Sequence, residues 1–140
     1  MATLLNTSAP MSSEISMILQ LATLAVLIIG FIIVKRKKHM THGITMFIAT
    51  VLSVISIATV MLPSIFQLAD TSIPGFNLLI RSHVILGITV LAVSVWILAD
   101  WRFQKPGPTC FQRKNWMLGL SLVWTSQLII GMLLFMMLYL

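Results

Sequence analysis

Long apolar runs alternate with short polar connections along this chain. Four runs, at about residues 15–34, 43–66, 82–101 and 116–140, contain few charged side chains. A helix needs about 20 apolar residues, at ~1.5 Å per residue, to cross the roughly 30 Å hydrocarbon core of a bilayer. Because hydrocarbon offers backbone groups no water to bond with, each run is predicted to be a membrane-spanning α-helix.

The short connections between the runs predict an all-α fold, an up-down-up-down bundle of four transmembrane helices. Residues 1–140 would then form a single integral membrane domain in contact with the lipid bilayer. Composition agrees, because 59% of the residues are hydrophobic, 9% are charged and the mean hydropathy is +1.04. Such a chain is too apolar for an ordinary soluble surface. The N-terminal stretch lacks the basic leader of a cleaved signal peptide, so we expect the first span to be retained.

Charge is distributed unevenly between the connections. The net charge is +6, and eight of the nine Lys and Arg residues lie in the first and third connections, whereas Arg81 lies at the other side. The positive-inside rule makes those basic connections cytoplasmic and places both termini on the non-cytoplasmic side of the cell membrane. The basic excess is therefore a topology signal rather than a sign of nucleic-acid binding. Anionic lipid headgroups are the expected partners of the first cluster, Lys35, Arg36, Lys37 and Lys38.

Small and polar residues recur at helical spacing on one face of each run. Helices in lipid associate through such faces, because small side chains allow close approach and polar ones bond across the interface. Ser53, Ser56, Gln127 and Gly131 are predicted to form a polar core on this basis. An unpaired amide is costly in the bilayer, so we expect Gln127 to bond to a partner on a neighbouring helix, such as Ser53, Ser56 or Gln20.

The three histidines are the main candidate ligands. His39 and His42 are three residues apart and share one side at the start of the second span, whereas His83 begins the third span on the other side. About 20 helical residues, or ~30 Å, would separate His42 from His83, so the pair could not share one metal or one haem. A site with Cys110 can be drawn beside His39 and His42, but Lys35–Lys38 would repel a cation there.

Each histidine also has an alternative interpretation. A hydrogen-bonded histidine at a helix start is favoured for His42, and a solvated histidine at the headgroups for His39. His83 could be functional, since an ionisable group facing a bundle interior suggests a role. It could equally join Asp70 and Arg81 in a polar cluster at the rim.

Apart from the histidines, the sequence contains few residues or motifs that could support catalysis or metal binding. Glu14, Asp70 and Asp100 all lie near predicted span ends, so no buried carboxylate pair is expected. Thioethers such as those of Met132 and Met136 suit Cu(I), although packing explains them more simply. The sequence shows no nucleophile constellation, phosphate loop or dinucleotide motif. We therefore expect a protein that is not an enzyme, and the sequence leaves the identity of any bound metal open.

Three segments carry a further pattern: HGITMFIATVLS, RSHVILG and WTSQLIIGMLLFMMLY. Together they resemble the domain-of-unknown-function four-twenty family, whose members are small four-span proteins often associated with respiratory oxidase assembly. The resemblance covers roughly residues 35–140. A further histidine of the family pattern falls at Arg113, whose guanidinium cannot ligate a metal or haem. The matching positions are His42, Met46, Ala49, Ser53, Ser82, His83, Trp124, Gly131 and Tyr139.

The resemblance implies a non-catalytic integral membrane accessory subunit or assembly factor that works with other integral membrane subunits. The metalloenzyme served would be a haem-copper respiratory oxidase or a membrane monooxygenase. The first alternative is a small membrane b-type cytochrome, in which His42 or His39, together with His83, would ligate haem b with help from another chain. The second is a small transporter, which the lack of inverted repeats and broken midspan helices disfavours.

Overall fold

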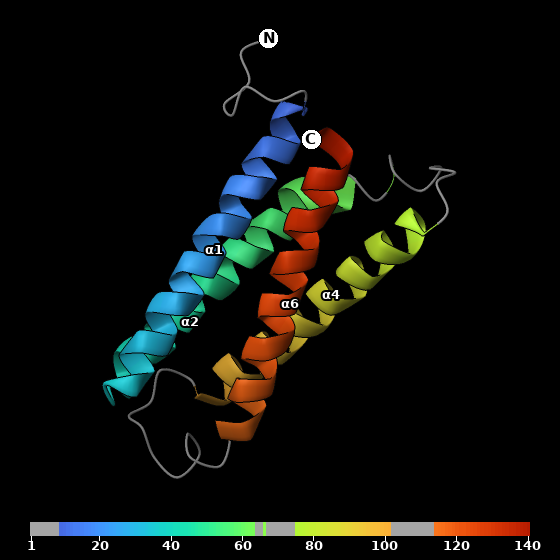
Figure 1. Ribbon diagram of the computed structural model, residues 1–140. Helices are drawn as coiled ribbons and strands as arrows, with labels where there is room; N and C mark the ends of the chain where they lie inside the picture. The colour runs from blue at the N-terminus through green and yellow to red at the C-terminus, as the bar shows by residue number, and fades with distance from the viewer. Residues whose placement is uncertain (1–8, 64–65, 67–74, 102–113) are drawn as a thin grey trace.

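The computed structural model describes residues 9–63, 66, 75–101 and 114–140, and this part of the chain is helical apart from short turns. Four long helices run alternately up and down (Figure 1). A short π-helix, η1 (Ile57–Met61), directly continues the second of them. The long helices are α1 (Met11–Lys35), α2 (His39–Ser56), α4 (Phe76–Trp101) and α6 (Lys114–Tyr139).

Each helix, with η1 counted as part of the second span, is long and apolar enough to cross a membrane. The prediction of an all-α bundle of four transmembrane helices is therefore confirmed. The helix bounds differ from the predicted ones most in the third span, which begins at Asn77 rather than near residue 82. His83 consequently lies about two turns inside α4. Asp70, Cys110 and Arg113 lie outside the described residues, and the sidedness of the termini stays a prediction.

The helices form a closed ring in which each one packs against its neighbours in the sequence. The α1 helix packs against α2 and α6, and α4 packs against α6 and α2. At the end that holds the start of α1 and the end of α6, the start of α4 lies away from the other helices (Figure 1). We call this end, at which the start of α4 diverges from its neighbours, the open end of the bundle (Figure 1).

Polar side chains fill much of the interior of the bundle, whereas large apolar side chains cover its outside. Exposed apolar residues occur on every long helix, among them Phe31, Val54, Ile85 and Leu122. This arrangement suits a lipid surround, because polar groups are kept away from the hydrocarbon. Some of them bond to other polar residues, as His83 does to Gln127, and others bond to a carbonyl of their own helix, as Thr23 does. The buried polar residues are Glu14, Ser16, Thr23, Thr50, Ser56, His83, Ser94 and Gln127.

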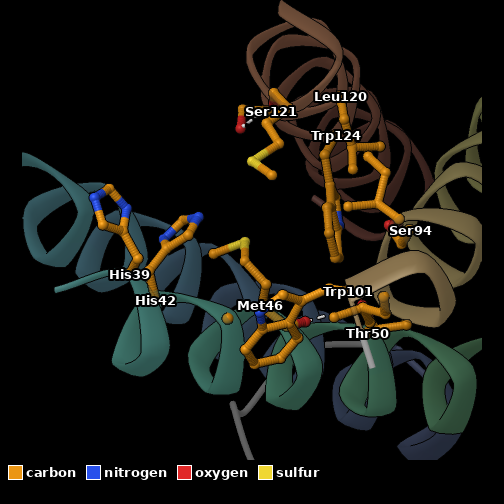
Figure 2. Close-up of a pocket in the computed structure, with 13 residues that line it drawn as sticks. His39, His42, Met46, Thr50, Ser94, Trp101, Leu120, Ser121 and Trp124 are labelled. Atoms are coloured by element: carbon orange, nitrogen blue, oxygen red, sulfur yellow. Dashed lines mark hydrogen bonds between the residues drawn. The ribbon is translucent and has the colours of Figure 1, made fainter. Parts of the chain in front are cut away.

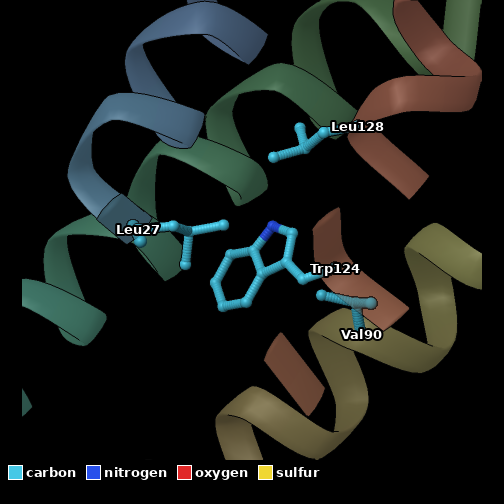
Figure 3. Close-up of a cluster of buried hydrophobic side chains, with 5 residues drawn as sticks. Leu27, Val90, Trp124 and Leu128 are labelled. Atoms are coloured by element: carbon cyan, nitrogen blue, oxygen red, sulfur yellow. The ribbon is translucent and has the colours of Figure 1, made fainter. Parts of the chain in front are cut away.

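One apolar layer crosses the middle of this polar interior. The indole of Trp124, which is 2% exposed, lies between Leu27 of α1 and Val90 of α4, with Leu128 beside it (Figure 3). Ala49 of α2 completes the cluster. We call this cluster the Trp124 layer. It divides the interior into two polar regions, one toward each end of the bundle.

The η1 segment widens the second span where it approaches the open end. The backbone N–H of Leu62 bonds to the carbonyl of Ile57, five residues earlier, as in a π-helix. Pro63 follows directly, and a proline ring has no N–H and clashes with the carbonyl four residues before it. A wider turn relieves that crowding, and single π turns often occur beside functional sites.

Candidate functional site

The first candidate site lies between the Trp124 layer and the end that holds Lys35. A cavity of about 70 Å³ lies there between α2, α4 and α6. His39, His42 and Met46 line it from α2, and Met117 lines it from α6. Figure 2 shows the ring of His42 and the thioether of Met46 turned toward the same open space. We call this cavity the His42 pocket.

His42 is held in one orientation by the neighbouring helix. Its Nδ1 lies 2.8 Å from the carbonyl oxygen of Gly30 on α1. Because a carbonyl can only accept, Nδ1 carries the proton and Nε2 keeps its lone pair. Metal-ligating histidines are usually fixed in this way, by a bond from the nitrogen that does not bind the metal.

Gly30 lets this contact form. A Cβ at Gly30 would collide with the methyl group of Met46 and would lie 3.6 Å from Nδ1 of His42. The two side chains, four residues apart on α2, therefore both pack on the same spot of α1. Their spacing alone predicts that His42 and Met46 share a face of α2. Because Gly30 has no side chain, this face can pack closely against α1.

Across the His42 pocket, two tryptophans and a serine form the opposite wall. The indole of Trp101 packs against Gly43, where a Cβ would collide with the ring. Trp124 closes the inner side of the pocket. Ser94 is 3% exposed, and its hydroxyl has no hydrogen-bond partner among the described residues. A small ligand or a water molecule would satisfy that hydroxyl.

The donors of the His42 pocket are imidazole nitrogen and thioether sulfur, which suit Cu(I) and haem iron better than hard cations. Within the described ranges, no group of three or more His, Cys, Asp or Glu side chains could hold a metal ion. His39 is exposed at the mouth of the pocket beside the Lys35–Lys38 segment. Any ligation here would therefore depend on His42 with the sulfurs of Met46 and Met117.

The second candidate site lies on the other side of the Trp124 layer and centres on His83. This side chain is 7% exposed, and its Nδ1 lies 3.1 Å from the carbonyl oxygen of Gln127. Nδ1 must therefore donate, which leaves Nε2 to accept from the side-chain amide of Gln127 at 3.5 Å. Both ring nitrogens are engaged within the bundle, so neither is available to ligate haem.

Gln127 does bond to a partner on a neighbouring helix, as predicted, but the partner is none of the three residues offered as examples. The amide bonds to His83 rather than to Ser53, Ser56 or Gln20. The reason is depth, because α4 begins earlier than predicted and brings His83 level with the middle of α6. The alternative in which His83 joins Asp70 and Arg81 in a polar cluster at the rim is not supported for Arg81. The Arg81 side chain is exposed, whereas His83 faces inward.

The predicted polar core surrounds this site. Ser53, Ser56 and Gln127 line a small cavity of about 30 Å³, together with His83. Gly131 is buried beside it, where a Cβ would collide with Oε1 of Gln20 and would come within 2.7 Å of Cε1 of His83. Only a residue without a side chain leaves room for both groups.

The two candidate sites are far apart. Trp101 lies level with Gly43, next to His42, and 18 residues of α4 separate Trp101 from His83. At ~1.5 Å per residue this is about 27 Å along the helix. His42 and His83 cannot ligate one haem, as the sequence predicts.

Sequence reasoning missed several residues of both sites. Ser94 belongs to the small and polar face of its run, but nothing in the sequence assigns it to a pocket, and Met117 carries no local signal. Only the packing of α4 and α6 on α2 brings both residues to the His42 pocket. Tyr139 and Ser13 are 126 residues apart and share a hydrogen bond of 3.0 Å at the open end. Glu14, expected near a span end, is fully buried.

Comparison with protein-family models, curated proteins and solved structures found no match. The resemblance to the four-twenty family therefore rests on the quoted motifs alone. Among those motif residues, His42 and Met46 lie together at one site, and His83 and Gly131 lie together at the other.

Proposed function

We propose that this protein is a non-catalytic accessory subunit or assembly factor of a membrane metalloenzyme. A haem-copper respiratory oxidase is the leading partner class, and a membrane monooxygenase is the second. The observation that carries the proposal is the His42 pocket. It combines an imidazole with a lone pair at Nε2, held by a backbone carbonyl, with thioethers from two helices.

The size of the pocket supports an accessory role over an autonomous redox protein. A haem macrocycle is far larger than a cavity of about 70 Å³. The pocket as built suits a single soft ion such as Cu(I), or one axial contact to a cofactor that another chain holds. Either use requires a partner that receives or supplies the cofactor.

Co-purification in a mild detergent tests the proposal. We expect subunits of a metalloenzyme to be enriched with the wild-type chain, and we expect His42→Ala and Met46→Leu to lower the cofactor content of that enzyme in cells. Met136→Leu is the matched control, because Met136 is exposed on α6 and lies outside the His42 pocket. The proposal would be contradicted if the wild-type chain purified alone. It would also be contradicted if the cofactor content of the partner enzyme were the same in both variants as in the wild type.

A small b-type cytochrome is the rival function, favoured by the lone pair of His42 at Nε2. The visible spectrum of the purified protein separates the two. A Soret band that disappears in His42→Ala and persists in His39→Ala would establish the cytochrome and refute the non-catalytic proposal. A spectrum without haem bands would eliminate the cytochrome.

A further inference from the structure

The open end of the bundle contains a second, larger cavity that the proposed function does not use. Its volume is about 350 Å³, and it lies at the end of the bundle opposite Lys35–Lys38. All four spans line it, with Val60 and Met61 contributed by η1. We call this cavity the vestibule. The polar residues that line it and matter below are Ser13, Ser16, Gln20, His83 and Tyr139.

Polar groups follow the vestibule from its mouth to His83. At the mouth, the hydroxyls of Ser13 and Tyr139 are 3.0 Å apart. Deeper on α1, the amide of Gln20 donates to the hydroxyl of Ser16 at 3.3 Å. Gln20 Oε1 and Cε1 of His83 both lie within 3 Å of the position that a Cβ at Gly131 would take, so the glycine leaves the space between them free of its own side chain. Seven residues of α1, or about 10 Å, separate Ser13 from Gln20.

An unpaired acceptor marks the inner end of this path. Gln20 Oε1 is buried and has no hydrogen-bond partner among the described residues. A buried acceptor that lacks a donor is costly, so a native structure usually supplies one. The adjoining cavity of about 30 Å³ is lined by Gln20, Ser53 and His83. Although much of its lining is apolar, the cavity also contains these polar groups and is large enough for a water molecule, which can donate to that oxygen.

We propose that the vestibule is a water-filled inlet through which His83 binds and releases protons on the side opposite Lys35–Lys38. The Trp124 layer closes the inner end, because Trp124, Leu27 and Val90 offer no polar group that could carry the path further, apart from the indole N–H. His83 is thereby accessible from one side only. This inference is independent of the His42 pocket and of the proposed function.

The hydrogen bonds of His83 define where the proton goes. Nδ1 already carries a hydrogen that is donated to the carbonyl of Gln127, so an incoming proton must add to Nε2. A hydronium ion in the inlet supplies it and leaves as water. The new N–H would then face the amide NH₂ of Gln127, which is also a donor. Rotation of that amide by half a turn presents Oε1 and restores the bond.

Among the described residues, few other ionisable groups lie near His83. Tyr139 of α6 lines the vestibule at its mouth. Glu14 of α1 is fully buried next to Ser13, and Arg81 of α4 is exposed two residues before His83. The η1 segment contributes only apolar side chains to the vestibule. Proton binding at His83 therefore places a positive charge in a site whose lining, as far as the described residues form it, is neutral.

Thiol labelling in sealed proteoliposomes tests the inlet and its sidedness. In a Cys110→Ser chain, single cysteines are introduced at Ser16 and Leu134, which line the vestibule, and at Leu133, which is exposed on the outer face of α6. We expect a charged, membrane-impermeant methanethiosulfonate added at the vestibule side to label the first two at least tenfold faster than the third. Equal, slow labelling at all three positions would overturn the water-filled inlet.

Nitrogen NMR tests proton binding in the same protein. With His39→Gln and His42→Gln in place, the remaining ¹⁵N-histidine signal belongs to His83. We expect Nε2 to change from the lone-pair to the protonated shift between about pH 8 and about pH 5, and the Gln127 amide to follow with the same midpoint. If the Nε2 shift stays at its unprotonated value throughout this range, proton binding by His83 is refuted, even if thiol labelling shows that water enters the vestibule.

Discussion

At the scale of single residues, two glycines on α6 show that the surrounding side chains decide whether a glycine can be replaced by alanine. Gly131 is buried against Gln20 and His83, whereas an added Cβ at Gly119 would meet nothing within 4 Å. Glycine in a helix interior is roughly 0.5–1 kcal/mol less favourable than alanine. At Gly131 that intrinsic gain is opposed by a collision with the buried polar groups.

We therefore expect Gly131→Ala to lower the free energy of unfolding by about 1–3 kcal/mol through overpacking. Gly119→Ala should leave it unchanged or raise it by up to about 1 kcal/mol. Reversible denaturant unfolding in detergent micelles measures both. Equal effects of the two substitutions would show that the contacts of Gly131 do not constrain the helix.

The inward positions of the polar core were predictable because small and polar residues recur at helical spacing. The bond between Gln127 and His83 was not, because it depends on the depth of His83. That depth follows from where α4 begins, and Arg81 interrupts the apolar run just before His83. Ser94 lies on the small and polar face of its run, whereas Met117 shows no such pattern. Both join the His42 pocket through tertiary packing, which the sequence does not reveal.

At the scale of elements, η1 sets which residues of the second span reach the vestibule. Met61 is the last residue of the π-helix, and its methyl group would lie 3.6 Å from a Cβ at Gly87 of α4. A regular α-helix would turn the residues after the π turn by about 100°, the angle per residue of an α-helix. The π turn therefore aims Met61 at α4.

Pro63→Ala restores a backbone N–H and removes the ring that crowds the preceding turn. We expect the variant to regularise Ile57–Met61 into α-helix and to move the Met61 methyl group away from Gly87. A nuclear Overhauser contact between ¹³C-labelled Met61 and the Gly87 α-protons should be present in the wild type and absent in the variant. Persistence of the contact would mean that packing, not Pro63, maintains the π turn.

The turn between α1 and α2 offers a second test at this scale. Lys37 adopts a φ of +59°, in the left-handed region that favours glycine. A side chain there costs roughly 1 kcal/mol, so Lys37→Gly should raise the unfolding temperature in detergent. Lys38→Gly is the control, since Lys38 has an ordinary φ of −90°. A gain of the same size in both variants would point to lost charge repulsion instead.

At the scale of the whole molecule, the number and type of the spans followed directly from the lengths of the apolar runs. Lipid requires backbone groups to bond within the segment, so a run of this length has few alternatives to a helix. The division of the interior by the Trp124 layer could not be predicted. It arises from one indole that reaches between α1 and α4, and many apolar residues of α6 have the same local pattern.

Orientation is the remaining property at this scale, and the basic connections predict it. A membrane-impermeant maleimide should label Cys110, the single cysteine of the chain, in inside-out vesicles and not in intact cells or right-side-out vesicles. Detergent-permeabilised samples control for intrinsic reactivity. Labelling from the outside alone would reverse the topology, and the vestibule would then open toward the cytoplasm.

The turn at Lys37 also bears on how the protein is made. Only Arg36, Lys37 and Lys38 separate α1 from α2, and these two helices share the most extensive helix contact in the described chain. A tight helical hairpin of this kind can enter the bilayer as one unit while the ribosome is still synthesising the later spans. The inner faces of α4 and α6, which carry His83 and Gln127, would then assemble against a template that is already in place.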